Sequence, residues 1–469
     1  MVIIALLYLI TFYNRYIQID ENFFAEQGYW LLNEGNVKIK SIPGVLNWNT
    51  QFFVYHKLLV WISSGIIYVF GWSIFNLKTF TLVVLILFLF LLWKYLREQG
   101  VGLAWMAIFI FISIPYILIK SFEFRPEVLM MLFTFSSFVY IDKSFKTNKY
   151  QSLLIAGVLA GIAFLVHLNA VIACVAGALT LLFRKDIKGT VVFSAAAIPI
   201  CLIYFYPLIV NQQLDAWFFE LKNWPTHNFD ESVSQGFLGT VSNIASKLAN
   251  EQKRFFWDEK VMIVSAIFFL SLLFSFKRLW ANHKNLIIYL GLLVISMAIL
   301  GSHVAPRYLL MYLPFMVITI VLAFTYSNKW FNYLFYALSF AQLVVLANTG
   351  IDIVARNKAY ASESRDLVSQ ISESRTSIIG PWEIIFDEIG NHDIYNFKTY
   401  EYQEDKMSAQ YTQMEVLEDL YNREVEFIVL DELMKNDKIY HWFHNWKIQQ
   451  NSYYQEFNRD DDYLILKRI

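Results

Sequence analysis

Long apolar segments separated by short polar ones make up most of the chain as far as residue 350. A helix needs about 20 mostly apolar residues to cross the hydrocarbon core of a bilayer, or somewhat fewer where protein covers its ends. By this criterion the pattern predicts about eleven membrane-spanning helices. They cover residues 1–13, 75–93, 102–119, 127–141, 152–166, 170–183, 190–210, 261–276, 286–302, 308–324 and 330–348.

Two apolar segments near the N-terminus need an interpretation of their own. Residues 1–13 have no basic region and no small-residue cleavage site, so we interpret them as a retained first span rather than a cleaved signal peptide. Residues 52–70 end at Gly71, and we expect an interfacial or partly embedded helix there rather than a full crossing. The reason is the polar content of this segment, which includes Tyr55, His56, Lys57, Ser63 and Ser64.

Lys and Arg residues collect in every second loop between the predicted spans. Cytoplasmic loops of membrane proteins carry an excess of these residues, so we expect the five basic loops to lie in the cytoplasm. The loops at 14–74 and 211–260, and the chain after residue 350, then lie on the outer face. The basic loops contain Lys94 and Arg97; Lys143, Lys146 and Lys149; Arg184, Lys185 and Lys188; Lys277, Arg278 and Lys284; and Lys329.

The composition indicates a membrane part followed by a soluble part. Hydrophobic residues make up 57% of the chain and charged residues only 16%, whereas soluble domains are about a quarter charged. Charged residues become dense after Asp352. We therefore predict an α-helical polytopic module at 1–350, with a catalytic first outer loop at 14–74, and a soluble extracytoplasmic domain at 351–469.

The predicted soluble domain has the pattern of a small α/β fold. Residues 414–421 read as an amphipathic helix with Met414, Leu417 and Leu420 on one side. Short apolar runs bounded by polar or turn residues are typical of strands. Such runs occur at 376–379, 426–430 and 463–467.

Charge and cysteine content exclude some functions. A formal net charge of −1 gives no indication of nucleic-acid binding. Cys174 and Cys201 both lie in apolar runs, where we interpret them as small hydrophobic residues. No Cys or His spacing resembles a zinc site.

Ionisable residues near the predicted spans collect on one side of the membrane. Charged groups near hydrocarbon are costly and often functional, although any one of them can instead reach the interface as a snorkelling or helix-end residue. As a set, they predict a polar cavity that opens outward. The set comprises Asp20, Glu21, Lys120, Glu123, Arg125, Glu127, His167, His303 and Arg307.

The Asp20-Glu21 pair follows the first predicted span and precedes a predicted amphipathic helix at 25–34, which ends at Gly35. Two carboxylates at the membrane surface suit a general base or a cation site. Because acidic residues also favour helix N-termini, an ordinary N-cap is the alternative interpretation.

The segment from Asp20 to Gly35 resembles the first loop of the lipid-dependent GT-C glycosyltransferases, such as protein O-mannosyltransferases and the aminoarabinose transferases of lipid A. In that family an Asp-Glu pair is followed by aromatic and small residues and then by Leu-x-x-Gly. This chain has Asp20-Glu21-Asn22-Phe23-Phe24 and then Leu32-x-x-Gly35, and a later Phe70-Gly71 also matches. The resemblance extends more loosely to about residue 326.

Three further motifs match in order, all on the predicted outer side. They are Phe124-Arg125-Pro126-Glu127, His167-Leu168-Asn169 and Ala305-Pro306-Arg307-Tyr308.

One motif of the family does not match. Many family members have Lys-Pro-Pro and a hydrophobic residue in the first loop, where this chain has Trp48-Asn49-Thr50-Gln51-Phe52. This departure leaves the donor and the sub-family open.

The resemblance implies transfer of a sugar from a polyprenyl-phosphate-linked donor to a lipid, glycan or protein acceptor at the outer face. Asp20, with Glu21 beside it, is then the catalytic base that deprotonates the acceptor hydroxyl. One displacement with a single base inverts the anomeric carbon, unlike the two-carboxylate retaining scheme. Cations would bind the donor phosphate, and the candidates are Arg307, Arg125 and Lys120.

Other polar residues of the outer face are predicted to bind substrate. The resemblance implies no certain cofactor, and a divalent ion held by Glu21 with His227 or His167 is a further hypothesis. A plain loop histidine is the alternative for His227. The expected location is the inner (plasma) membrane. The substrate-binding candidates are Glu127, His167, Asn169, His303, Trp224 and His227.

Two other classes of function compete with this interpretation. A transporter or flippase would also have an outward-facing polar cavity, but paired Pro/Gly interruptions and mid-span acids are missing from the sequence. A catalytically inactive assembly scaffold, with the soluble tail as its working part, is the third hypothesis.

Overall fold

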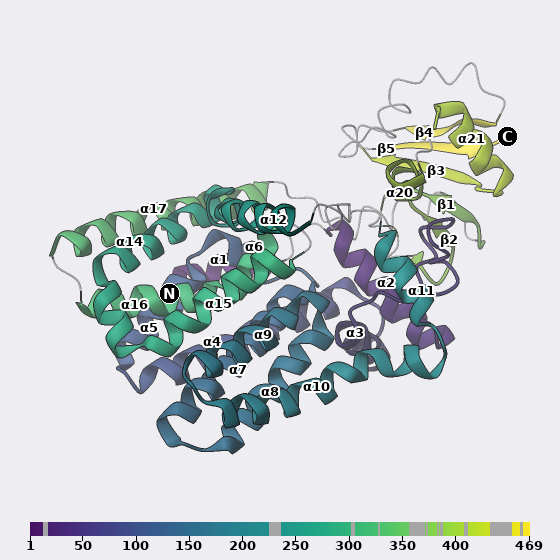
Figure 1. Cartoon of the computed structure of the whole chain (residues 1–469). Helices are drawn as coiled ribbons and strands as arrows, with labels where there is room; N and C mark the ends of the chain where they lie inside the picture. The colour runs from purple at the N-terminus through teal and green to yellow at the C-terminus, as the bar shows by residue number, and fades with distance from the viewer. Residues whose placement is uncertain are drawn as a thin grey trace.

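A computed structural model describes residues 1–12, 17–224, 236–301, 305–326, 329–355, 371, 374–381, 384, 388–407, 411–431, 453–459 and 463–469. Helices dominate the chain as far as residue 355, and a small sheet lies beyond them (Figure 1). The helices are α1 (Val2–Phe12), α2 (Ile19–Glu34), α3 (Lys57–Phe70), α4 (Ile74–Arg97), α5 (Val101–Ile112), α6 (Pro115–Lys120), α7 (Pro126–Thr147), α8 (Tyr150–Val166), η1 (Leu168–Ala170), α9 (Val171–Phe183), α10 (Ile187–Val210), α11 (Leu214–Lys222), α12 (Gly236–Asn250), α13 (Gln252–Phe256), α14 (Glu259–Asn282), α15 (Lys284–Leu300), η3 (Pro306–Met311), α16 (Leu313–Tyr326) and α17 (Lys329–Ala355).

Five of these helices are long and apolar enough to cross a membrane, by length and composition: α4, α7, α10, α14 and α17. The remaining predicted spans correspond to shorter apolar helices, such as α1, α8 and α15. The total of about eleven spans stays a prediction. The apolar segment at 52–70 forms the 14-residue helix α3.

Two of the predicted spans are not continuous helices. Residues 102–119 divide into α5 and α6, because Pro115 lacks a backbone N–H and holds Ile114 in an extended conformation, with ψ at 118°. Residues 308–324 divide into η3 and α16, with Pro314 in the first turn of α16, where its missing N–H leaves no intrahelical bond unmade. The prediction of one helix at each place was wrong.

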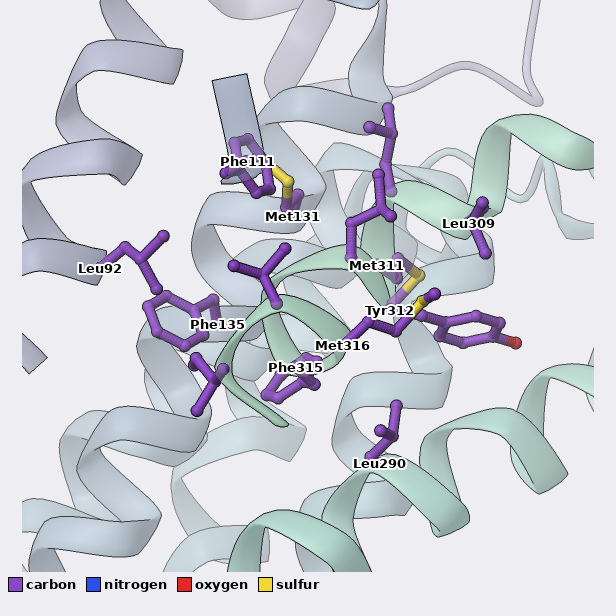
Figure 2. Close-up of a cluster of buried hydrophobic side chains, with 14 of the residues drawn as sticks. Leu92, Phe111, Met131, Phe135, Leu290, Leu309, Met311, Tyr312, Phe315 and Met316 are labelled. Atoms are coloured by element: carbon purple, nitrogen blue, oxygen red, sulfur yellow. The ribbon is translucent and has the colours of Figure 1, made fainter. Parts of the chain in front are cut away.

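The core of the bundle surrounds α16, in which every residue from 313 to 323 is buried. A helix that is apolar all round is expected in such a central position. Phe315 of α16 packs edge-on against Phe135 of α7, with 5.8 Å between ring centroids. Figure 2 shows side chains of this core converging from several helices, including Leu92, Phe111, Met131, Leu290 and Met316.

The sheet after the bundle has five strands in the order β2-β1-β3-β5-β4. β1 (Ser377–Ile379) runs parallel to β2 (Asp393–Tyr395) and to β3 (Phe427–Asp431). β5 (Tyr463–Arg468) lies antiparallel between β3 and β4 (Tyr454–Arg459). Within the described residues of this part, two helices accompany the sheet, α20 (Lys398–Met407) and α21 (Gln413–Asn422).

The strands expected at 376–379, 426–430 and 463–467 are β1, β3 and β5, and the expected helix is α21. Its buried residues are Val416, Leu417 and Leu420, whereas Met414 is exposed. The prediction that Met414 lies on the buried side was therefore wrong. Helix α17 runs to Ala355, and the domain boundary near 350 stays a prediction.

The sheet packs against the first loop of the bundle, at the end where α2 and α11 lie (Figure 1). One hydrophobic cluster contains Ile39, Ile42 and Trp48 from the loop together with strand residues such as Ile378 and Phe427. Polar contacts reinforce this interface. The Asn396 N–H donates to the Ser41 carbonyl at 2.7 Å, and the Gln403 side chain donates to the Gly44 carbonyl at 3.1 Å.

Candidate functional site

Glu21 anchors the start of α2. The backbone N–H of Gln18, the N-cap residue, donates to Glu21 Oε2 at 2.8 Å. Glu21 Oε1 accepts the Phe124 N–H at 2.7 Å, and Lys78 Nζ lies 3.3 Å from Glu21 Oε2. Glu21 is fully buried. It therefore fastens the segment before α7 onto α2, and both of its carboxylate oxygens already have partners in this structure.

Asp20 has different surroundings from its neighbour. It lies in the first turn of α2 and is not the N-cap, and its side chain is 42% exposed. The carboxylate forms an ion pair with Arg125, and Arg307 Nη1 lies 3.8 Å from Asp20 Oδ2. Of the Asp20-Glu21 pair, Asp20 is thus the carboxylate that an incoming molecule can reach.

Arg125 and Glu127 form a buried pair at the start of α7. Arg125 Nη2 donates to Glu127 Oε1 at 3.0 Å, and Arg125 Nε donates to Glu127 Oε2 at 3.1 Å. Pro126 separates them at the first helical position, which presents both side chains to the same region. Burial opposes the charge on Arg125, but Glu127 and Asp20 raise the pKa of its guanidinium well above the ordinary value.

Arg307 completes a cluster of four charges. It stands at the start of η3, and its Nε atom lies 3.5 Å from Glu127 Oε1. Its side chain is 35% exposed, against 7% for Arg125. We call Asp20, Arg125, Glu127 and Arg307 the charge cluster. Arg125 and Glu127 are buried and bonded to each other, whereas Asp20 and Arg307 are partly exposed. Asp20 and Arg307 are therefore the pair available to a ligand.

Two histidines stack beside the charge cluster. The rings of His56 and His167 lie 4.2 Å apart between centroids, with 26° between their planes. His167 Nε2 is 3.2 Å from the Tyr308 hydroxyl. Burial lowers the pKa of His56 to about 4, and the charges of Glu127 and Arg307 also act on it. His56 was missing from the residues predicted for the site, although its polar character within an apolar segment was a signal for it.

Other predicted site residues lie at the edge of the cluster or apart from it. Lys120 forms an ion pair with Glu123 at 2.5 Å, and Glu123 also accepts from Gln18 Nε2 at 2.6 Å. The Asn169 backbone N–H donates to His167 Nδ1 at 3.0 Å, and substrate binding by the Asn169 side chain stays a prediction. His227 and His303 lie outside the described residues.

Trp224 belongs to an aromatic group between the loops and the sheet. Its ring lies 5.2 Å from that of Trp48 and 5.7 Å from that of Phe52, between centroids. Phe23 of α2 contacts all three of these rings. Trp48 also contacts Tyr402 of α20 at 6.0 Å. In this arrangement Trp224, which follows α11, packs against the loop after α2 and against Phe23, three positions after Asp20.

Two buried acidic residues, Glu26 and Glu220, hold the loops around the site, and the sequence did not predict them. Glu26 of α2 accepts from the Lys40 N–H at 2.8 Å and from the Ser41 N–H at 3.0 Å. Glu220 of α11 accepts the N–H groups of two successive residues, Phe53 and Val54, both at 3.0 Å. These bonds fasten the chain on either side of Trp48.

Arg254 holds the segment that leads to Arg307. Its guanidinium donates to the Ala305 carbonyl and pairs with Glu251 at 2.9 Å. Both members of the pair are buried. Because Ala305 precedes η3 by one residue, Arg254 fixes the point from which Arg307 and Tyr308 project.

No three side chains of His, Cys, Asp or Glu come together as a metal-binding group in the part of the chain that the structure describes. Among the described residues of the charge cluster, each carboxylate already has an arginine partner. The proposed metal ion therefore stays a hypothesis.

Comparisons with known proteins show which family model and which solved structures this chain resembles. Residues 58–210 match the family model described as dolichyl-phosphate-mannose-protein mannosyltransferase, and no curated protein sequence matches the chain. The fold is similar to that of ArnT from Cupriavidus metallidurans bound to undecaprenyl phosphate, with a TM-score of 0.64, 11% identity, and coverage of 100% of this chain and 97% of ArnT. It is also similar to the archaeal oligosaccharyltransferase AglB from Archaeoglobus fulgidus in complex with an inhibitory peptide and a dolichol-phosphate, with a TM-score of 0.54, 12% identity, and coverage of 92% of this chain and 69% of AglB.

Proposed function

We propose that this chain is a multi-pass membrane glycosyltransferase of the GT-C superfamily, which moves a sugar from a polyprenyl-phosphate-linked donor to an acceptor at the outer face of the membrane. The family model matched by residues 58–210 and the similarity of the fold to ArnT and AglB support this proposal. The observation that supports this most directly is the pairing of a reachable carboxylate, Asp20, with a reachable guanidinium, Arg307, at 3.8 Å. A base for the acceptor and a cation for the leaving phosphate are the two groups that the reaction requires.

Asp20 is the proposed base. The acceptor hydroxyl loses its proton to the Asp20 carboxylate as its oxygen attacks the anomeric carbon, and the bond from that carbon to the donor phosphate oxygen breaks. One such displacement inverts the configuration of the sugar, and no second carboxylate is needed as a nucleophile. Glu127 is buried against Arg125, so it does not compete for the role.

Arg307 is the proposed partner of the phosphate. A phosphate that leaves as an anion is stabilised by charge-assisted hydrogen bonds, and arginine supplies two parallel donors for them. Arg125 is tied to Glu127 through two hydrogen bonds, which makes it a support for Asp20 and Arg307. Lys120 is engaged with Glu123, and we keep it as a secondary candidate that would bind the phosphate only after that ion pair opens.

The outer-face location and the extracytoplasmic sheet are part of the same proposal. The loops that carry Asp20, Arg125 and Arg307 alternate with the basic loops along the chain, and basic loops favour the cytoplasm. The sheet packs on the loop that follows α2, so it lies on the same side as Asp20.

Transfer from a panel of radiolabelled polyprenyl-phosphate sugars, in membranes that contain the wild type or Asp20→Asn, tests the proposal. We expect the substitution to lower transfer by at least about a hundredfold, the usual contribution of a general base. Asp215→Asn is the matched control, since Asp215 is an exposed aspartate in the first turn of α11 and should leave transfer unchanged. Equal transfer by the Asp20→Asn protein would exclude Asp20 as the base. Movement of the intact lipid-linked sugar across the membrane, without transfer, would support a flippase instead.

A further inference from the structure

A short chain of hydrogen bonds connects the turn after α8 to the charge cluster. The Asn169 backbone N–H donates to His167 Nδ1 at 3.0 Å, and His167 Nε2 lies 3.2 Å from the Tyr308 hydroxyl oxygen. The His167 and Tyr308 rings meet edge-on, 5.4 Å apart between centroids. Tyr308 follows Arg307 directly in η3.

The first of these bonds fixes the tautomer of His167. A backbone N–H can only donate, so Nδ1 must present its lone pair and carries no proton. Burial, with His56 stacked on the ring, lowers the pKa of His167 well below its ordinary value. The ring is therefore neutral with its proton on Nε2, and Nε2–H donates to the Tyr308 oxygen.

This direction of the bond leaves the hydroxyl hydrogen of Tyr308 unused. Arg307 also interacts with the Tyr308 oxygen, and a guanidinium has only donors. Both contacts therefore use the oxygen as an acceptor. Within the described residues, no acceptor for the Tyr308 hydroxyl hydrogen is found, although the residue is buried. A buried donor without a partner is costly, and an anionic oxygen arriving beside Arg307 would supply the missing acceptor.

We propose that His167 is a positioning residue that turns the Tyr308 hydroxyl into a hydrogen-bond donor for the phosphate of the polyprenyl carrier, next to Arg307. This inference rests on the proposed function, in which Arg307 supplies the charge for the phosphate, and adds a hydrogen-bond donor beside it. His56 contributes by stacking on the His167 ring, which restricts the rotation of that ring.

Two substitutions separate the two halves of the His167 ring. His167→Asn keeps an acceptor at the Nδ1 position for the Asn169 N–H and loses the donor to Tyr308. His167→Gln keeps a donor near the Nε2 position and loses the acceptor for the turn. Both remove the stack on His56, so that loss is matched between them. Tyr308→Phe removes the hydroxyl itself.

Binding of undecaprenyl phosphate to the purified full-length protein in lipid nanodiscs is the measurement, with undecaprenol as the control that lacks the phosphate. We expect His167→Asn and Tyr308→Phe each to weaken binding by about tenfold, the usual effect of one lost hydrogen bond to a charged group. His167→Gln should weaken it by less than about threefold. The double variant His167→Asn/Tyr308→Phe should bind no more weakly than either single variant, because both changes remove the same donor.

Thermal unfolding of the same proteins distinguishes positioning from a general structural role. His167→Gln loses the turn contact and should unfold at a lower temperature than His167→Asn, yet bind the phosphate more tightly. Affinity that follows stability, with His167→Asn equal to or better than His167→Gln, would overturn the inference about His167 alone. Wild-type protein that binds undecaprenyl phosphate no better than Arg307→Ala or than it binds undecaprenol would overturn the proposed donor site itself.

Discussion

Arg307 Nη1 lies 3.8 Å from Asp20 Oδ2, and both side chains are more than one third exposed, at 35% for Arg307 and 42% for Asp20. The two groups are near enough to attract each other, but solvent screens the pair and neither is locked to the other. Arg307 can therefore exchange its contact with Asp20 for a contact with an incoming anion.

Arg307→Ala is expected to lower kcat/KM for the lipid-linked donor by about a hundredfold to a thousandfold, as the loss of one transition-state donor commonly does. Arg307→Lys should recover part of this, because it restores charge without the paired donors. Steady-state transfer kinetics check the prediction. Arg125→Ala is the contrasting variant, since it removes both hydrogen bonds that buried Glu127 accepts from Arg125 and should lower stability by about 3–5 kcal/mol. Activity that falls in Arg307→Ala only in parallel with stability would contradict this division.

Glu26 and Glu34 lie on the same helix, α2, and allow a matched comparison of two carboxylates. Glu26 is buried and accepts two backbone N–H groups together with the Trp30 indole at 3.0 Å. All three donors meet the same oxygen, Glu26 Oε1, so Glu26→Ala leaves them without an acceptor, and we expect a loss of about 1–3 kcal/mol of stability. Glu34 pairs with Lys38 and Lys40 at the surface, so Glu34→Ala should change stability by less than about 1 kcal/mol. Thermal unfolding followed by tryptophan fluorescence would reveal equal losses if Glu26 were not an anchor.

Glu220 predicts a dependence of stability on pH. Burial raises the pKa of its carboxyl from 4.5 to about 7 in the folded protein. Between these pH values the unfolded chain has released the proton and the folded protein still binds it. Stability from this group is therefore complete below about pH 4.5 and falls as pH rises through about 7, by roughly 3 kcal/mol in total.

The measurement is the apparent unfolding temperature of wild type and Glu220→Gln between pH 4.5 and pH 8. The difference between the two proteins isolates this group, because all other titrating groups are shared. We expect wild type to lose stability relative to the variant as pH rises. A constant difference across the range would show that Glu220 titrates near its ordinary pKa.

Substitutions at Gly44 and Gly35 distinguish the effect of backbone strain from the effect of a lost contact with the sheet. Both have positive φ, 79° and 73°, where a side chain causes strain. A Cβ atom at Gly44 would lie 2.8 Å from Gln403 Nε2, whereas one at Gly35 meets nothing within 4 Å. Gly44→Ala should therefore loosen the sheet from the first loop, and Gly35→Ala should cause only the conformational loss of about 1 kcal/mol. Hydrogen exchange of α20 and β2 should increase in Gly44→Ala alone; equal exchange in both variants would count against the interface.

Much of the site was predictable because its charges are rare within an otherwise apolar chain. Asp20, Arg125 and Arg307 stood out by type and by their shared position near predicted outer ends, and the structure brings them together. The resemblance to GT-C glycosyltransferases is confirmed. Strands β1 and β3 were recognisable as short apolar runs between polar residues. By contrast, β2 and β4 have mixed sequences that depend on their neighbours in the sheet.

The anchors of the loops could not be predicted, because each is a long-range contact of a residue that looks ordinary in sequence. Glu220 meets Val54 across 166 positions, and nothing local marks it as different from other loop acids. Glu21 and Asp20 are adjacent and chemically alike, but only their surroundings assign one to anchoring and the other to the surface. His56 reads as one polar residue in an apolar segment until His167 is placed against it.

The contact between Gln403 and Gly44 joins positions 359 residues apart. During synthesis, the ribosome makes the loop after α2 long before it makes α20 or the strands that cover this loop. While the membrane helices insert, Ile39, Ile42 and Trp48 lack the strand residues that later cover them. Contacts between positions so far apart in the sequence form late and slowly. The loop after α2 thus acquires its final support after the bundle has assembled, so a ribosome stalled before β3 would yield an inserted protein whose candidate site is incompletely ordered.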